Sequence, residues 1–183
     1  GSEEYGGTKE WAQDEKLGFT EEQAERIAQA DKAVDHSLGT NPIPLIGDQS
    51  YHFNTNPDSP SGSTGDSRRE NAEEHLANAI EHQNKADDLR ETRQDGFFGG
   101  IVNFVNDIKA SYHEDKALDE LGKGLHAVQD ITAHKDEYVT KESLYGYEYY
   151  THLNEKGKDA DKPGFRNDPN ARYQEAKKDT VEY

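Results

Sequence analysis

Apolar residues recur at helical spacing in four stretches of the chain, and this spacing predicts amphipathic helices. The stretches run from about 21 to 38, 68 to 94, 101 to 112 and 115 to 137. No stretch shows the strict alternation of a half-buried strand, so the predicted fold is a single all-α domain. The residues expected to face its core are Ala24, Ile27, Val34 and Leu38; Ala72, Leu76, Ala79, Ile80 and Ala86; Ile101, Phe104, Val105, Ile108 and Tyr112; and Leu118, Leu121, Leu125 and Val128.

Residues that commonly begin or interrupt helices mark several boundaries. Thr20 followed by Gln23 predicts a capping box at the start of the first helix. The glycine-rich stretch Gly96–Gly100 is expected to break the chain between the second and third helices. A last helix is predicted to run to the end of the chain, with Asp168 as its N-cap and Pro169 at its first helical position.

Three further segments lie outside the predicted helices. Residues 1–19 are interpreted as a cloning scar and a lead-in segment that only Trp11 anchors, and residues 20–183 as one helical domain. Residues 39–67 form a loop rich in glycine, proline, asparagine and serine, and loops of this length are usually functional. Residues 138–165 are tyrosine-rich and are expected to be irregular.

The composition gives this domain a thin core. Only 31% of the 183 residues are hydrophobic, the mean hydropathy is −1.17, and no cysteine is present to form disulfides. A bound metal is one way to compensate. The net charge of −17 disfavours electrostatic capture of nucleic acid or an anionic membrane, but it suits a basic partner protein and is compatible with a metal-dependent hydrolase. No apolar run approaches the length of a membrane span.

The strongest candidate chemistry lies in residues 121–134. His126, Asp130 and His134 are spaced four apart, so on a helix their side chains form one stripe. Two imidazoles and a carboxylate are typical ligands of a divalent metal, most often zinc. The same stripe is also compatible with the solvated face of an amphipathic helix. The spacing alone leaves both interpretations open.

Other charged or titratable residues occupy unusual positions. Asp31 falls within the apolar stripe of the first helix and Asp35 at its edge, where a carboxylate is costly unless it is paired or coordinated. A salt bridge would satisfy this requirement as well as a metal. His52 lies between two aromatic residues in the long loop and is a candidate ligand. His75 and His82 are about 10 Å apart along a helix, so they cannot share one metal.

The order of these residues resembles the zinc-dependent phospholipase C and single-strand nuclease superfamily. Asp48 and the stretch His52-Phe53-Asn54-Thr55-Asn56-Pro57-Asp58 are followed by a long helix, then by the His126, Asp130 and His134 motif, and then by His152. The stretch LGKGLHAVQDITAH is even more similar to C-terminal toxin domains of Rhs-type polymorphic toxins. The resemblance covers roughly residues 20 to 181.

This resemblance implies an all-helical domain around one to three zinc ions. It implies that His52, His126 and Asp130 hold one metal together with Asp48, and that Asp130 bridges to a second. Asp48 could instead act as the base that orients water, so Asp48 and Asp130 are the candidate catalytic residues. In the same scheme His134 and a later histidine hold another metal.

That later histidine is His152, whose site a carboxylate would complete. Lys156 occupies the position where the superfamily's phospholipases place an acidic residue, so Glu155 or Asp161 would substitute for it. The secreted enzymes use an N-terminal tryptophan as a ligand, but Trp11 is internal. The remaining candidates are Asp31 and Asp35, which would replace that ligand from the first helix, and Phe53 and Tyr147, which would contact substrate.

Phosphodiester hydrolysis is the chemistry that follows from the resemblance. The main hypothesis is a phospholipase C-type toxin that acts on phospholipid headgroups, secreted or delivered into a target cell as part of a larger toxin and blocked by an immunity protein. A nuclease of the same fold is the second hypothesis. The third is a non-catalytic domain that metal stabilises and whose acidic surface binds a partner. An open coordination position would favour an enzyme.

Overall fold

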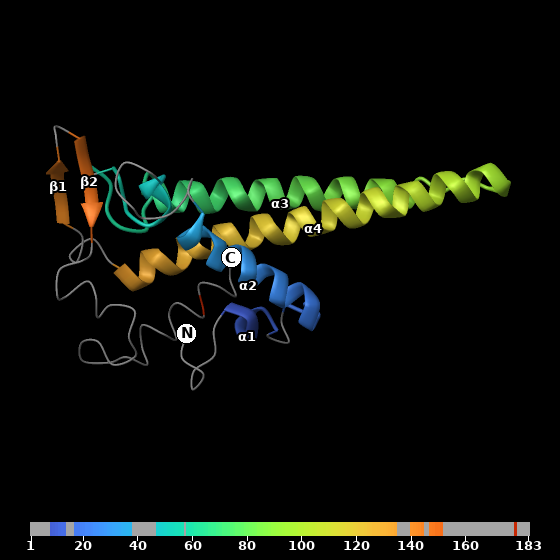
Figure 1. The fold of residues 1–183 in the computed structure, drawn as a ribbon. Helices are drawn as coiled ribbons and strands as arrows, with labels where there is room; N and C mark the ends of the chain where they lie inside the picture. Colours follow the sequence, from blue (N-terminus) through green and yellow to red (C-terminus); the bar gives the residue numbers. More distant parts are fainter. Residues whose placement is uncertain are drawn as a thin grey trace.

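The described part of the chain is built almost entirely from helices (Figure 1). The computed structural model describes residues 8–13, 17–37, 47–56, 58–134, 140–144, 147–151 and 178. The all-α prediction is confirmed, because the two strands form only one small hairpin. The elements are α1 (Thr8–Ala12), α2 (Glu21–His36), the 3-10 helix η1 (Gln49–Tyr51), α3 (Ser67–Glu91), α4 (Gly96–His134), β1 (Thr140–Leu144) and β2 (Tyr147–Thr151).

Two long helices, α3 and α4, run antiparallel and form a helical hairpin (Figure 1). Helix α2 packs on only part of α4, and α1 packs on α2. The strands and the loop around η1 lie at one end of the hairpin, and the turn between α3 and α4 lies at the other (Figure 1). The half of the helical hairpin near this turn is its distal half, and it extends beyond α2. Helix α2 packs only on the proximal half, near the strands and η1 (Figure 1).

The starts of two helices follow from capping residues. The predicted capping box of α2 is present: the Gln23 amide donates to Thr20 Oγ1 over 3.2 Å, and the Thr20 amide donates to Gln23 Oε1 over 2.9 Å. Helix α3 begins at the N-cap Asp66, whose carboxylate accepts from the Arg68 amide over 3.0 Å. Each cap satisfies a backbone N–H that the first turn of a helix leaves unpaired.

Helix α4 corrects the predicted boundaries in its part of the chain. It is one helix of 39 residues, about 58 Å long, where the sequence suggested separate helices before and after position 114. No proline interrupts it, so the shift in its apolar pattern marks a change of packing partner. It also includes the glycine-rich stretch that was expected to break the chain. The turn before it is closed by Asn103 Nδ2, which donates to the Gln94 carbonyl over 2.9 Å.

The main core lies where α1, α2 and α4 meet. Partly buried Phe19 packs against this cluster. The sequence predicted the four residues of this cluster that lie on α2 and α4, but α1 lies in a segment that was expected to be only a lead-in. The buried residues of the cluster are Ala12, Ala24, Ile27, Leu118 and Leu125.

The core predicted for the distal half of α4 is wrong. Five residues expected to point inward are exposed, as is Ile80 on α3 at 52%. The reason is that α2 covers only the proximal half of α4. Farther out, α4 faces α3 through small residues such as Ala110 and through polar pairs such as Arg90 with Glu114. The exposed fractions are 51% for Ile101, 66% for Phe104, 41% for Val105, 56% for Ile108 and 57% for Tyr112.

The tyrosine-rich segment also differs from its prediction. Part of it forms an antiparallel hairpin in which Thr140 pairs with Thr151 and Leu144 pairs with Tyr147. Threonine and tyrosine favour strands, but the mixture of polar and aromatic residues hides a simple alternation. The predicted last helix lies outside the described residues except for Lys178, which is helical. Among the described residues, no helix combines the length and apolar character needed to span a membrane.

Gly122 is expected to be essential for the approach of α2 to α4. A Cβ at this position would lie 2.6 Å from Ala30 Cβ and would also overlap the Ile27 carbonyl oxygen. Gly122→Ala should therefore destabilise the protein by about 1–3 kcal/mol through overpacking, although alanine favours helices. Urea unfolding provides the measurement. Gly100→Ala in the same helix meets nothing within 4 Å and should be neutral or stabilising. Equal effects of the two substitutions would contradict this account of the helix crossing.

Candidate metal site

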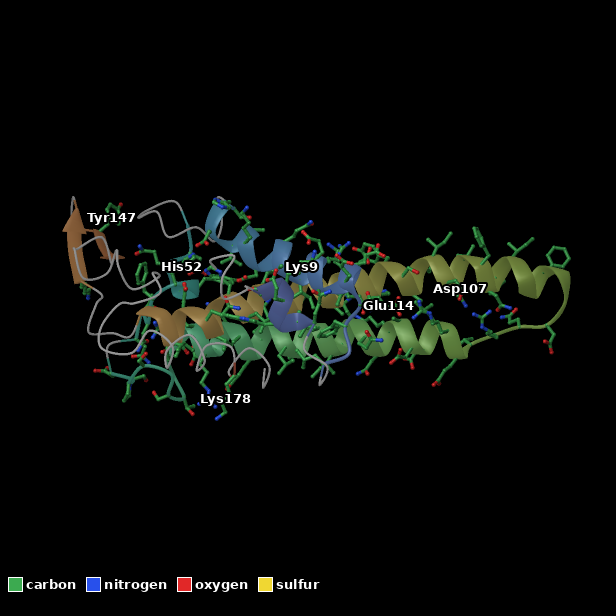
Figure 2. The ribbon with its side chains drawn as sticks, turned by 90° about the horizontal axis from the view of Figure 1, so that it is seen from below. Lys9, His52, Asp107, Glu114, Tyr147 and Lys178 are labelled. Atoms are coloured by element: carbon green, nitrogen blue, oxygen red, sulfur yellow. The ribbon has the colours of Figure 1, made fainter. Side chains whose placement is uncertain are left out.

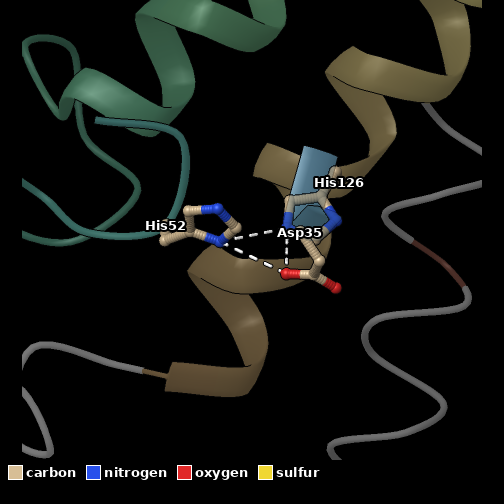
Figure 3. A group of neighbouring side chains, drawn as sticks. All are labelled: Asp35, His52 and His126. Atoms are coloured by element: carbon tan, nitrogen blue, oxygen red, sulfur yellow. Dashed lines mark hydrogen bonds and ion pairs between the residues drawn. The ribbon is translucent and has the colours of Figure 1, made fainter. Parts of the chain in front are cut away.

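Three side chains from three segments converge where α2, α4 and the loop after η1 meet (Figure 3). One ligand atom each of Asp35, His52 and His126 lies within 4.8 Å of the others. His126 Nε2 is 3.1 Å from His52 Nδ1 and 3.6 Å from Asp35 Oδ1, and His52 Nδ1 is 3.8 Å from Asp35 Oδ1. Both histidines are buried and Asp35 is exposed. This group could hold a metal ion.

Asp130 places a further carboxylate oxygen beside both histidines of this group. It follows His126 by one helical turn, and its Oδ2 lies 2.9 Å from His52 Nδ1 and 3.3 Å from His126 Nε2. Its side chain is mostly buried, with 13% exposed. The donor set is therefore two imidazole nitrogens and two carboxylate oxygens. Nitrogen and oxygen donors of this kind suit divalent cations.

A second layer of polar groups orients His126 from the opposite side of its ring. His126 Nδ1 lies 3.0 Å from Asp31 Oδ1, and Thr8 Oγ1 donates to Asp31 Oδ2 over 2.6 Å. Gln129 Nε2 in turn donates to Thr8 Oγ1 over 3.1 Å. A hydrogen bond from Nδ1–H to Asp31 leaves the Nε2 lone pair facing the other ligand atoms. Carboxylate-oriented histidines are a regular feature of metal sites.

The electrostatics of the site favour a positive charge. Burial lowers the pKa of His126, but the carboxylates of Asp130 and Asp31 outweigh burial and raise this pKa well above 6.5. The two carboxylates therefore favour positive charge at this ring. A divalent cation would supply positive charge to the same carboxylates. The acidic surroundings thus stabilise either form of positive charge.

The loop that presents His52 is held by contacts on both sides of it. Asp48 caps η1, because its Oδ1 accepts from the Ser50 amide over 2.9 Å and from Ser50 Oγ over 2.5 Å. Tyr51 Oη lies 2.8 Å from His75 Nε2, and the other ring nitrogen of His75 lies 2.6 Å from Glu120 Oε2. This Tyr51–His75–Glu120 chain ties η1 to both α3 and α4. It fixes the backbone immediately before His52.

A fully buried ion pair lies behind the site. Arg68 and Asp66 are both 0% exposed, and Arg68 Nη2 donates to Asp66 Oδ2 over 2.8 Å. Arg68 Nη1 also donates to the Asp130 carbonyl over 3.3 Å, which links the pair to the ligand-bearing turn of α4. Burial raises the pKa of Asp66, but hydrogen bonds from Arg68 and the Gly62 amide outweigh burial. The pKa of Asp66 therefore lies below its usual value. The pair was not predicted, because its only signal in the sequence is an aspartate at the N-cap position before α3.

The structure brings together five of the residues proposed from the sequence and separates others. Asp48 was predicted to share a metal with His52 and His126, but its carboxylate caps η1 and lies outside the group of Asp35, His52 and His126. Phe53 was predicted to contact substrate, but it is 1% exposed and packs in the interior. Tyr147 begins β2 and is 64% exposed, and it lies at the same end of the molecule as the site (Figure 2). The residues brought together are Asp31, Asp35, His52, His126 and Asp130.

Four proposed ligands cannot be placed. His134 is the last residue of α4, and its side chain lies outside the described residues. His152, Glu155 and Asp161 also lie outside them. The predicted second and third metal positions depend on these residues. They stay predictions.

We expect Glu120→Gln to make stability less dependent on pH in acid. Burial raises the pKa of Glu120, but hydrogen bonds from His75 and Lys123 outweigh burial and lower this pKa to about 2. A depressed carboxyl pKa contributes stability above the unfolded value of 4.5, and this contribution is lost as the pH falls from there towards 2. The variant should therefore lose roughly 3 kcal/mol at pH 7 and little at the acid end.

Urea unfolding across this pH range measures the difference between the two proteins. The matched control is Glu22→Gln in the exposed first turn of α2, which should change little at any pH. A gap between wild type and Glu120→Gln that stays constant with pH would contradict the assignment.

Comparison of the chain with known protein families, curated proteins and solved structures finds no match.

Proposed function

We propose that His52, His126, Asp130 and Asp35 bind zinc and that the domain hydrolyses phosphodiesters. The spacing of the four ligand atoms carries this proposal. Zinc in a tetrahedral site lies about 2.0–2.1 Å from nitrogen and oxygen ligands, which puts neighbouring ligands about 3.3 Å apart. Five of the six separations among these four atoms run from 2.9 to 3.8 Å, and the sixth joins the two carboxylates. The buried donors therefore fit zinc with little rearrangement.

The ligands differ in how they would serve catalysis. When bound, zinc supplies Lewis acidity and lowers the pKa of coordinated water towards neutrality. His52, His126 and Asp130 are the buried part of the set, and they would hold the ion in place. Asp35 is the ligand exposed to solvent, with 49% of its side chain accessible. Its side of the site is where a water molecule and a phosphodiester could approach.

Phospholipid headgroups are the substrate class we favour. The order of the histidine and aspartate motifs resembles zinc-dependent phospholipases C and the toxin domains related to them. The net charge of −17 opposes simple electrostatic capture of nucleic acid, which makes a nuclease the weaker alternative. The same resemblance supports a delivered toxin and an immunity protein as its partner. These proposals rest on the resemblance and also require the proposed metal site.

A non-catalytic, metal-stabilised domain is the second candidate function, and one observation favours it. Structural zinc sites are usually closed by four protein ligands, whereas catalytic sites leave a position open. Four protein ligand atoms converge here. The two functions therefore differ in whether Asp35 leaves its position when substrate is present.

Hydrolysis by the zinc-loaded protein separates these alternatives. The substrates are bis(p-nitrophenyl) phosphate as a generic diester, phosphatidylcholine vesicles and single-stranded DNA. We expect turnover of the generic diester and of the vesicles, with Asp130→Asn inactive and His82→Ala fully active. Cleavage of DNA alone would move the function to a nuclease. Stable zinc binding without turnover of any of the three would favour the non-catalytic domain.

Loss of the Asp31 carboxylate should weaken zinc binding although Asp31 does not face the metal position. Asp31 orients His126 through Nδ1, and such outer contacts typically contribute about 10–100-fold in metal affinity. Asp31→Asn should therefore raise the zinc dissociation constant by about this factor, as measured by competition with a fluorescent chelator. Asp88→Asn on α3 removes a comparable charge far from the site. An affinity for Asp31→Asn equal to that of Asp88→Asn would contradict the proposed role.

A further inference from the structure

The distal half of α4 carries an exposed apolar stripe, which we define as Ile101, Phe104, Val105, Ile108 and Tyr112. All five side chains are more than two-fifths exposed. Asp107 and Glu114, in contrast, point towards α3 and the turn after it, where they pair with Arg93 and Arg90 (Figure 2). Within the described part of the chain, no element packs over this stripe. A contiguous apolar patch of this kind usually marks an interaction surface.

The stripe continues a face of α4 that is already an interface. Going towards the site, the same face carries Asp119, then Gly122, then His126, and α2 covers all three. Arg26 on α2 donates to Asp119 Oδ1 over 2.8 Å, and Gly122 lies against α2 at the helix crossing. Helix α2 begins at Glu21, so the cover ends there while the apolar face of α4 goes on. The part left uncovered has the form of a helix-packing surface.

The spacing within the stripe identifies the kind of partner. Residues 101, 105, 108 and 112 alternate steps of four and three, which is the repeat of a coiled-coil seam. Such a seam fits another helix with the same repeat. A membrane-surface helix would also have basic residues on its polar face. In residues 85–116, which surround the stripe, acidic residues outnumber basic ones. Binding to an anionic membrane is therefore disfavoured.

We propose that this stripe pairs with the same stripe of a second copy of the chain, forming an antiparallel dimer of α4 helices. A two-fold axis makes one patch serve as its own partner. Residues 85–116 carry five basic and seven acidic residues, a net charge of −2 out of −17, so two copies meet there with little repulsion. The two aromatic side chains alone expose roughly 250 Å². The aliphatic residues and their flanks extend this towards the roughly 800 Å² per partner of a stable interface.

The dimer would leave the metal site accessible. Tyr112 and His126 are fourteen residues apart on α4, about 21 Å along the helix axis. The inference is therefore independent of the proposed function. Substitutions in the stripe should change the oligomeric state without changing zinc binding.

Analytical ultracentrifugation of the full chain tests the proposal. The wild type should sediment as a dimer at tens of micromolar and dissociate on dilution, and the double variant Ile101→Glu with Ile108→Glu should be monomeric. Both side chains are exposed, so the variant should keep its helical circular dichroism. Asn84→Glu on the outer face of α3 should remain dimeric. A wild type that is monomeric at every concentration overturns the proposal.

Cysteine cross-linking tests the geometry, because the chain contains no cysteine of its own. In an antiparallel pair only residues near the two-fold axis lie close to their own copies. With the axis at the middle of the stripe, single cysteines at positions 105 and 108 should form a disulfide-linked dimer on mild oxidation, whereas a cysteine at position 101 should not. Asn84→Cys should not cross-link. Binding of the monomeric wild type to neutral phosphatidylcholine vesicles, lost in the double glutamate variant, would overturn the dimer and assign the stripe to a membrane surface.

Discussion

Replacement of Arg68 by alanine is expected to lower the free energy of unfolding by about 3–5 kcal/mol. Arg68 and Asp66 are completely buried, and the substitution leaves the Asp66 carboxylate without its guanidinium partner. A domain of this kind is stable by only about 5–15 kcal/mol in total. The loss would therefore remove a large share of its stability. It would also free the carbonyl of Asp130 from its contact with Arg68.

The neighbouring arginine supplies a matched control. Arg69 forms an exposed pair with Glu73 one turn later on α3, and its side chain is 44% exposed. Exposed pairs of this type contribute only about 0.3–0.5 kcal/mol. Urea unfolding of both variants should therefore separate them clearly. Similar losses for Arg68→Ala and Arg69→Ala would show that the buried pair has no special part in holding the site together.

Zinc is expected to raise the melting temperature of metal-stripped protein by about 10 °C. A ligand that binds only the folded state stabilises it by about 4 kcal/mol at a thousandfold excess over its dissociation constant. For a chain of this length, each kcal/mol corresponds to about 2–4 °C. The ligands come from α2, the η1 loop and α4, so one ion would connect segments that are distant in sequence. It would also neutralise the clustered carboxylates.

The effect should disappear when one buried ligand is removed. His126→Ala is expected to show no zinc-dependent shift in differential scanning calorimetry. His82→Ala should show the full shift, because His82 on α3 pairs with His113 on α4 and takes no part in the site. A large zinc shift that survives in His126→Ala would mean that the ion binds elsewhere.

The sequence was sufficient to predict the proximal part of the fold because its signals there are local. Thr20 and Gln23 define the start of α2, and apolar spacing identifies the faces of α2 and α4 that carry Ile27 and Leu125. Helical spacing also predicts that His126 and Asp130 share a face. Asp31 and Asp35 were recognisable because they fall within or beside an apolar stripe. Local periodicity could not show how closely these two helices approach one another.

The errors arise where long-range packing decides the structure. Periodicity showed that Ile101 and Ile108 share one face, but it could not show that α2 ends before it reaches them. Asp48 precedes a short helical turn, and its capping role was hidden by its place in the His52 loop. Arg68 looks like an ordinary surface residue at a helix start, and only the fold places it beneath Asp130. Thr8 is likewise brought to Asp31 by the packing of α1.

Zinc K-edge X-ray absorption of protein loaded with one equivalent of zinc tests the central claim most directly. About one ion per chain should survive dialysis, coordinated by two imidazole nitrogens and two oxygens at about 2.0–2.1 Å. The imidazole signal should halve or the ion should be lost in His126→Ala. Zinc that dialyses away from the wild type, or a first shell of water oxygens alone, would contradict the proposal that His52, His126, Asp130 and Asp35 form a metal site.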